Sequence, residues 1–470
     1  MIRTIARKEL VEMLRDGRFR IAAAVVLVLL TGALLLGWQH YRDVSRQHAA
    51  AQQATRAQWL GQGKKNPHSA AHYGIYAFKP KLPLTMVDTG TDPYTGVAVW
   101  LEAHKQNEFK YRPAQDATAV QRLGELTGSS VLQLLVPLLI VLLAFQTFSG
   151  EREQGTWRQM LSLGVRPADL ARGKALGVAG ALAILLVPAT LTGVAALTLA
   201  SGQADMSAAL PRMMWMALAY LLYFGIFAAG SLAVSAWAPS SRAALIGLLA
   251  FWMFNGLIAP RGASDLAKAL RPTPSAFSFA HRLELDLAGS GHDSSEERIK
   301  RLERDLLKKY NVSRVEDLPI NFNGARLQDG EDHGNLIFDR AYSDLWQTFS
   351  EQDGVRRVIS LVAPSLAVQS ASMAFAGSDF PQHAHFAKAA EEYRRLIQRT
   401  MNEDLMKNAG NSGAYYANDD LWARVPPFVY NAPGAWWVML RQVPSFGVLA
   451  GWMGLMALFF VRGVNRTGVV

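Results

Sequence analysis

Apolar residues are distributed unevenly along the chain and gather in blocks long enough to cross a bilayer. A transmembrane helix needs about 20 consecutive, mainly apolar residues. Six stretches approach this length without Asp, Glu, Lys, Arg or His: Ile21–Trp38, Val131–Phe148, Ala175–Ala200, Met213–Trp237, Ala243–Ala259 and Val443–Val461. The pattern predicts an all-α polytopic membrane protein with six transmembrane helices. The fifth stretch is the shortest, so a buried helix of a soluble core is its alternative interpretation.

Residues 1–20 have a helical period of apolar positions and precede the first span directly. Ile2, Ile5, Leu10 and Met13 share one stripe, which predicts an interfacial helix lying among the lipid headgroups. The alternative is a solvated helix packed on protein. The opposite, basic face carries Arg3, Arg7, Lys8 and Arg15.

A cleaved signal peptide is a competing interpretation of the N-terminus, because three alanines follow at Ala49–Ala51. The apolar run, however, exceeds the roughly 7–15 residues of a signal peptide. We therefore favour an uncleaved membrane anchor.

The formal net charge of the chain is +10, and the positions of its basic residues indicate how the spans are oriented in the membrane. Many basic residues lie at the edges of the apolar blocks, so we interpret them as topological signals and expect no nucleic-acid partner. Short basic segments precede the first span, separate spans two and three and spans four and five, and follow the sixth. The positive-inside rule then places both termini, the loop 149–174 and the tail 462–470 in the cytoplasm. The long segments 39–130 and 261–442 are expected to be extracytoplasmic.

These two outside segments have helical patterns of their own. Arg42–Leu60 and Gln115–Gly128 are expected to be helical, as are residues 294–310 and 385–407. Asn311–Gly334 is expected to be a loop with a short strand. Val358–Phe375 is apolar but interrupted by Pro364, so we expect a helix that rests on the membrane or on a domain core and does not form a seventh span.

The stretch FSGEREQGTWRQML, Phe148–Leu161, leaves the second span with several charges and then resumes an apolar pattern. Trp157, Met160 and Leu161 form an i, i+3, i+4 face, which predicts a short helix parallel to the membrane. The alternative is a loop helix packed on its own protein alone. Three charged residues are expected to be available to a partner: Glu151, Glu153 and Arg158. Gly155 allows an unusual backbone angle, and Thr156 is expected to cap the helix that follows.

FSGEREQGTWRQMLSLGVRPADLARGKALG, Phe148–Gly177, resembles the signature between the second and third spans of the permease subunits of ABC-2-type exporters. The N-terminal IARKELVEMLRDGRF, Ile5–Phe19, resembles their interfacial elbow helix. Residues 364–405 resemble a poorly characterised branch with a large extracytoplasmic insertion before the last span. The positions that match the family's coupling loop are Glu151, Glu153, Gly155 and Thr156. Trp157 departs mildly, because an aliphatic residue is commoner there.

The resemblance implies a subunit of the bacterial inner membrane that pairs with a second permease copy or a paralogue. Two cytoplasmic ABC ATPases would bind ATP and Mg²⁺, and their closure would move the coupling loop, residues 151–163. The sequence agrees with ATP binding by separate subunits, because GQGKKN, Gly61–Asn66, lacks the spacing of a phosphate-binding loop. We therefore expect a chain that is not itself an enzyme and binds no cofactor.

Several other residues carry weaker signals. His383 and His385 are weak metal candidates, with Asp379, His281 or His292 as further ligands, because two histidines one residue apart match no strong metal motif. The predicted spans hold no ionisable residue, which argues against ion-coupled transport. Gln133 and Asn255 either line a pathway or bridge helices. Gly447 and Gly451 could serve helix packing or dimerisation.

The functional prediction is an exporter-type permease that moves a hydrophobic or amphipathic cargo when a separate ATPase works. The alternative is a mechanical transducer that passes ATPase strokes to a periplasmic lipoprotein, metal chaperone or envelope complex. A membrane-anchored enzyme or receptor is a third class, for which the sequence offers no catalytic residues.

Overall fold

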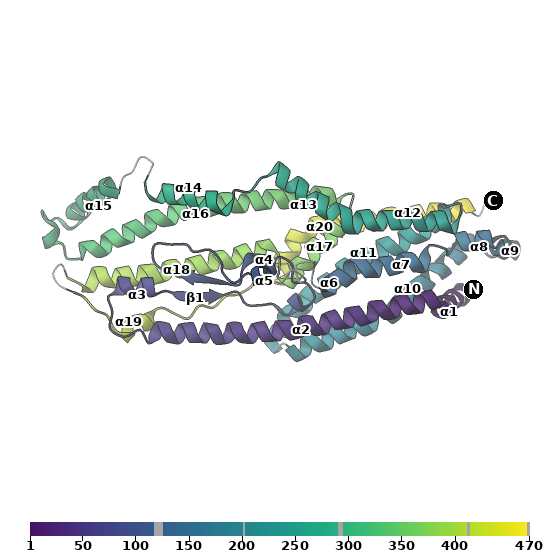
Figure 1. Ribbon diagram of the computed structural model, residues 1–470, viewed down its shortest axis with the longest axis horizontal. Coiled ribbons are helices and arrows are strands. Elements are labelled where there is room, and N and C mark those ends of the chain that lie inside the picture. Colours follow the sequence, from purple (N-terminus) through teal and green to yellow (C-terminus); the bar gives the residue numbers. More distant parts are fainter. Residues whose placement is uncertain (117–125, 201–202, 290–294, 411–413, 468–470) are drawn as a thin grey trace.

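The computed structural model of the chain describes residues 1–116, 126–200, 203–289, 295–410 and 414–467 (Figure 1). The molecule is elongated, with a helical bundle at one end and a second helical domain, here called the distal domain, at the other. The N-terminus and the C-terminal end of the described residues, at Thr467, lie at the free end of the bundle, here called the loop end, beside α8 (Ser149–Glu153) and α9 (Thr156–Ser162). The predicted all-α polytopic fold is confirmed.

Within the described residues, six helical segments are long and apolar enough to cross a membrane. Each contains one predicted span and continues beyond it, because helix formation does not stop where the apolar block stops. The segments are α2 (Gly17–Leu60); α6 (Gly128–Ser130), η3 (Val131–Leu135), α7 (Val136–Ala144) and α8; α10 (Pro167–Ala200); α11 (Gln203–Trp237); α12 (Ser241–Met253), η4 (Phe254–Ile258) and α13 (Ala259–Leu270); and α20 (Ala435–Thr467).

The N-terminal helix α1 (Ile2–Arg15) packs along α10. Two glycines of α10 make the close approach feasible. A Cβ added at Gly173 would come within 2.5 Å of Ile5, and one at Gly177 within 2.6 Å of Glu9. Part of the apolar stripe of α1 is therefore buried on protein. The turn into α2 falls at Asp16, which has an extended backbone (φ −65°, ψ 115°).

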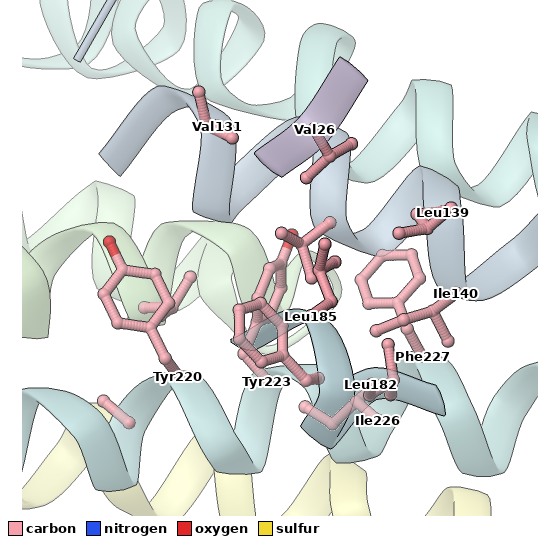
Figure 2. Packing of buried hydrophobic residues seen from close by; sticks show 14 of the residues in the cluster. Val26, Val131, Leu139, Ile140, Leu182, Leu185, Tyr220, Tyr223, Ile226 and Phe227 are labelled. Atoms are coloured by element: carbon pink, nitrogen blue, oxygen red, sulfur yellow. The ribbon is translucent and has the colours of Figure 1, made fainter. Parts of the chain in front are cut away.

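The bundle core contains side chains from all six spans, and Figure 2 shows the part that spans one to four form. Apolar side chains of α2, α7 and α10 surround aromatic residues of α11, and several of them are fully buried. Polar side chains also lie inside: Gln133 donates to the hydroxyl of Tyr220 (3.1 Å), and Asn255 donates to that of Tyr223 (3.0 Å). Gln133 and Asn255 thus bridge helices, as one of the two interpretations expected.

The apolar stretch Val358–Phe375 is not one helix. Helix α16 (Phe322–Ser360) ends inside it, and α17 (Pro364–Ala376) begins after a short turn, because Pro364 starts a new helix more readily than it continues one. Helix α17 is buried in the bundle core, where Val368 and Phe375 are fully enclosed. Ser365 and Ser372 bond to Asn255 and Tyr220, so α17 joins the polar network.

The expectation that no ionisable residue lies inside the bundle is wrong for Arg212. The predicted fourth span begins one residue later, but α11 begins earlier and buries Arg212. Its guanidinium donates to the carbonyl oxygens of Ala374 (3.4 Å), Phe375 (3.3 Å) and Pro433 and to the side chain of Gln382 (3.0 Å). The carbonyl groups at the end of α17 carry partial negative charge, which accommodates the buried cation.

The distal domain combines both segments that the sequence placed outside the membrane. Its main helices are α16, α18 (Phe380–Asn408) and the outer half of α2. Trp59 of α2 and Trp422 lie edge to face (6.2 Å), and Trp59 donates to the Trp422 carbonyl (2.9 Å). Smaller elements complete it: α3 (Pro67–Tyr73), β1 (Ile75–Phe78), α4 (Asp92–Thr95), β2 (Ala98–Leu101), α5 (Pro113–Asp116), α14 (Ala276–Leu287), α15 (Ser295–Tyr310), η5 (Val315–Asp317) and α19 (Asp419–Arg424). The short helix η1 (Pro83–Met86) instead packs on α2 and contributes Leu84 and Met86 to the bundle core. Strands β1 and β2 form an antiparallel pair.

The prediction of a loop with a strand over Asn311–Gly334 is wrong from residue 322 onward, where α16 begins. Asn321 caps this helix by accepting from the Gly324 amide (2.9 Å). Gly324 also lies against α18, where a Cβ would come within 2.9 Å of the Met406 nitrogen. Tertiary packing therefore makes a helix from a glycine-rich, polar stretch. The predicted helix at Arg42–Leu60 is confirmed, whereas most of Gln115–Gly128 lies outside the described residues.

Candidate functional site at the loop end of the bundle

Helices α8 and α9 form a corner at the loop end of the bundle. Gly155 joins them with φ 75°, the left-handed conformation that favours glycine. A Cβ added there would meet no atom within 4 Å, so the backbone angle, and not lack of space, requires the glycine. The unusual backbone angle expected at Gly155 is therefore present, and it sets the corner between the two helices.

The apolar face of α9 points into its own bundle. Trp157 is 4% exposed and lies edge to face with Phe148 (5.6 Å). Met160 and Leu161 pack partly on the same core. The outer surface holds Arg158 and Gln159 and, just after the helix, Leu163, which is 82% exposed.

Glu151 is used within the chain, so the expectation that its carboxylate is available to a partner is wrong. Its Oε1 lies 2.7 Å from Nζ of Lys174 and 3.3 Å from Nζ of Lys8. Lys174 is 1% exposed and also lies 2.7 Å from Glu9. Burial makes the internal partner necessary, because an unpaired charge would be costly there.

This network joins α1 and α10 to the corner, and the sequence pattern predicted no pairing for Glu9 or Lys174. A signal existed for Glu9, because it is a carboxylate one turn after Ile5 and one turn before Met13 on the apolar stripe of α1. Of the predicted interfacial residues, Arg3, Arg7 and Arg15 are exposed. Lys8 belongs to the network through Glu9, Glu12 and Glu151.

Arg152 and Glu153 bind the corner to the turn between α11 and α12. Arg152 donates to the carbonyl oxygens of Ala236 (2.8 Å) and Ser235 (2.9 Å), near the C-terminal end of α11. Glu153 accepts from the amide (2.8 Å) and the hydroxyl (2.8 Å) of Ser241, at the N-terminal end of α12. Each charge has the sign that the neighbouring helix end favours. The role of Arg152 was missed by the sequence analysis.

Thr156 does not cap α9 as expected. Gly155 occupies the cap position, and the Thr156 hydroxyl donates backward to the carbonyl of Glu151 (3.2 Å). The hydroxyl thus fastens α9 to α8, which keeps the corner compact.

The corner therefore contacts several spans while exposing one face. Salt bridges lead from it to α1 and α10, hydrogen bonds lead to α11 and α12, and Phe148 lies edge to face with Phe460 of α20 (5.7 Å). A displacement of the exposed face would be passed to all these helices, because charged contacts fix the corner in position.

The two weak metal candidates do not converge. His383 is buried between Phe109 (4.5 Å) and Phe380 (6.2 Å), whereas His385 bonds to the hydroxyl of Tyr430 (3.0 Å). Burial, reinforced by Lys79, lowers the pKa of His383 to about 3. The two rings thus have separate structural partners in the distal domain.

Comparison with known families gives two matches. The sequence matches the profile described as ABC-2 family transporter protein over residues 3–306. A domain of unknown function, DUF3526, matches residues 277–431, which hold much of the distal domain. No curated protein matches the chain in sequence.

Proposed function

The chain belongs to the ABC-2 family of transporter proteins, and we propose that it is the membrane-embedded permease subunit of an ATP-driven exporter. A pair of separate ABC ATPases binds ATP and Mg²⁺ and docks on the corner formed by α8 and α9. The cargo is hydrophobic or amphipathic, since the buried charge of Arg212 in the bundle interior is fully engaged by carbonyl oxygens and Gln382 and is not free to bind a charged cargo.

The connection between the exposed end of α9 and the surrounding helices supports this proposal most directly. The exposed face at the end of α9 carries Arg158, Gln159 and Leu163, the last an apolar side chain that is 82% exposed and that the proposed ATPase would cover. Behind it, Glu151 and Glu153 connect the corner to α10 and α12. An ATPase pressing on this surface would move the spans on either side.

The proposed orientation places the loop end in the cytoplasm of a bacterial inner-membrane protein. Exposed arginines gather there, which the positive-inside rule favours on the cytoplasmic side. They are Arg3, Arg7, Arg15, Arg20, Arg158, Arg166, Arg172, Arg242, Arg462 and Arg466. In this orientation α1 lies at the inner lipid surface and the distal domain is extracytoplasmic.

A second permease copy or a paralogue completes the proposed transporter. A groove of about 610 Å³ along α20 is lined by Leu361, Gly447, Gly451 and Leu455, among others. A Cβ added at either glycine would meet nothing within 4 Å, so this face is open to a neighbouring helix. Cysteine cross-linking at Gly451→Cys tests the pairing cleanly, because the natural chain has no cysteine.

The docking surface is tested with Leu163→Asp in a complex purified with its ATPase from native membranes. We expect the variant to insert and fold but to lose most ATPase stimulation, because the exposed side chain supports no internal packing. Leu336→Asp, at a 69% exposed apolar position in α16, is the matched control. Equal stimulation in the two variants would show that the ATPase does not contact Leu163.

The orientation is tested separately with single cysteines. Ser162→Cys at the end of α9 and Ser313→Cys in the distal domain are both at exposed positions. In intact cells, a membrane-impermeant thiol reagent is expected to label Ser313→Cys and to leave Ser162→Cys unlabelled until the membrane is opened. The opposite pattern would reverse the proposed topology.

A mechanical transducer is the second candidate, favoured by the continuity of α2. This helix has 44 residues and spans about 66 Å, more than twice the ~30 Å hydrocarbon core. It therefore connects the loop end to the Trp59–Trp422 contact without a break. ATP-dependent movement of lipid or cargo in proteoliposomes supports the exporter, whereas ATP-dependent changes confined to the distal domain support transduction to a periplasmic partner.

A further inference from the structure

Three histidines from two parts of the distal domain meet at one point. His68 and His72 lie on α3, and His104 follows β2. Their ring centroids are separated by 4.7, 5.0 and 4.9 Å. Nε2 of His68 lies 3.2 Å from Nε2 of His72 and 3.2 Å from Nε2 of His104. All three thus present a ring nitrogen to a common centre, with ligand atoms within 4.8 Å of one another.

Local structure positions each ring. His68 and His72 are four residues apart on a helix, which places both on one face. His104 has φ 65°, an uncommon conformation for a residue other than glycine, which costs free energy unless its surroundings hold it. Here Glu331 of α16 holds it, because its Oε2 accepts the His104 amide (3.2 Å) and its Oε1 lies 2.6 Å from Nδ1 of His104.

Glu331 is itself fixed. Its side chain is 2% exposed and accepts a further hydrogen bond from Gln398 of α18. A buried carboxylate oxygen 2.6 Å from Nδ1 favours the tautomer that carries its proton there, and this tautomer leaves the Nε2 lone pair of His104 facing the other two rings. This is the arrangement that commonly orients metal-bound histidines.

Hydrogen bonding among neutral rings accounts poorly for the cluster. When the proton of His104 is on Nδ1, beside Glu331, its Nε2 can only accept, so His68 must supply the proton at their 3.2 Å contact. The same single N–H would then also face Nε2 of His72 at 3.2 Å. A cation at the centre would instead use all three lone pairs.

We propose that His68, His72 and His104 bind a first-row transition-metal dication through their Nε2 atoms, with Glu331 as the positioning residue for His104. Tetrahedral Zn²⁺ with Zn–N bonds of about 2.0–2.1 Å requires nitrogen atoms roughly 3.3 Å apart. The two 3.2 Å separations match this geometry. His72 and His104 are exposed, so the fourth position faces solvent and is open to water or to a ligand from a partner.

The site is independent of the proposed function, because it lies in the distal domain, away from the loop end. It connects α3 and the segment after β2 to α16 through Glu331, so metal binding would fasten the first outside segment to the second. An exchangeable fourth position suits a dication that is sensed or handed over at this surface.

The test uses the full-length chain, purified in detergent with a histidine-free tag and dialysed against EDTA. Zn²⁺ affinity is measured by competition with a chromophoric chelator, and Co²⁺ absorption reports coordination geometry. We expect one equivalent of metal, tetrahedral Co²⁺ bands, and at least a 100-fold loss of affinity in His72→Ala and His104→Ala. His281→Ala, which removes an exposed histidine of α14, is the matched control and should bind as the natural chain does.

Glu331→Gln separates positioning from ligation. It keeps all three ligands and is expected to bind one equivalent about 10- to 100-fold more weakly. Zn²⁺ should raise the melting temperature of the natural chain and of His281→Ala but not of His72→Ala. Less than one equivalent bound by the natural chain, or unchanged affinity in both His72→Ala and His104→Ala, would overturn the proposal. If a histidine variant fails to fold, the Co²⁺ spectrum of the natural chain decides the question. Octahedral Co²⁺ bands would then be sufficient by themselves to overturn the proposal.

Discussion

Nζ of Lys174 lies 2.7 Å from Oε1 of Glu151, so the start of the third span is joined to the end of the second at the loop end of the bundle. The same ammonium lies 2.7 Å from Glu9 of α1. One buried cation thus holds three segments around the corner that we propose as the ATPase docking surface.

Replacing Lys174 by Met is expected to destabilise the protein by about 3 kcal/mol, because Glu9 and Glu151 would remain without their main cation. The melting temperature in detergent and ATPase stimulation should both fall. Adding Glu9→Gln and Glu151→Gln to Lys174→Met should restore part of the stability, since no unpaired carboxylate remains. If Lys174→Met alone were as stable as the natural chain, the role assigned to the network would be contradicted.

Gly155 offers a test of the corner that separates backbone angle from side-chain bulk. Gly155→Ala should cost about 1 kcal/mol and reduce coupling, since φ 75° is unfavourable for alanine and no atom lies within 4 Å of its Cβ. Gly155→Asn is the matched control, because asparagine tolerates this conformation better despite its larger side chain. Stimulated ATPase activity is the measurement. If Gly155→Asn reduced the stimulated ATPase activity more than Gly155→Ala did, side-chain bulk at the partner surface, and not the backbone angle, would be the cause.

Arg212 connects the fourth span to the end of α17. Arg212→Met should destabilise the protein by about 3 kcal/mol, because the carbonyl groups of Ala374, Phe375 and Pro433 lose a shared donor. Arg212→Lys keeps the positive charge but not the planar guanidinium with its several donors, so it should restore only part of the lost stability. Limited proteolysis near α17, together with the melting temperature, reports the effect. Full rescue by lysine would show that charge alone matters.

His383 predicts a pH dependence of the distal domain. Burial, reinforced by Lys79, lowers its pKa to about 3, with Asp92 opposing and Arg112 adding to the effect. The folded chain therefore keeps the ring neutral, whereas the unfolded chain binds a proton below about pH 6.5. The contribution of this group to the free energy of unfolding is complete well above pH 6.5 and falls by up to about 3 kcal/mol by pH 4.5.

The measurement is the melting temperature in EDTA between pH 7 and pH 4.5, so that metal at the other histidines does not contribute. His383→Leu removes the titrating ring and should give a shallower decline than the natural chain. Parallel declines in the two proteins would exclude His383 as the source.

The spans and the corner at Gly155 were predictable because their signals are local. A run of apolar residues determines membrane insertion wherever the rest of the chain lies. The apolar face of Trp157, Met160 and Leu161 was also visible, but not the direction in which it points. Whether a partner or the protein's own core covers such a face depends on distant segments, here Phe148.

The roles of charged residues were the least predictable part of the site. Glu151 was expected to be free, yet it pairs with Lys174, and Glu9 and Arg152 were given no partners. Spacing along one helix cannot reveal such pairs, because their members lie on different helices. The helix over residues 322–334 was missed for a similar reason, since its support comes from α18.

The sequence by itself determined the membrane class, the number of spans and the alternation of the chain between two ends, because hydrophobicity and charge act over one helix length. Only the tertiary structure decided that the two outside segments form one domain, that α17 enters the bundle core, and that His68, His72 and His104 meet beside Glu331. These relationships join residues far apart in the chain. Packing selects them through close approach and the pairing of buried charges, which no local pattern encodes.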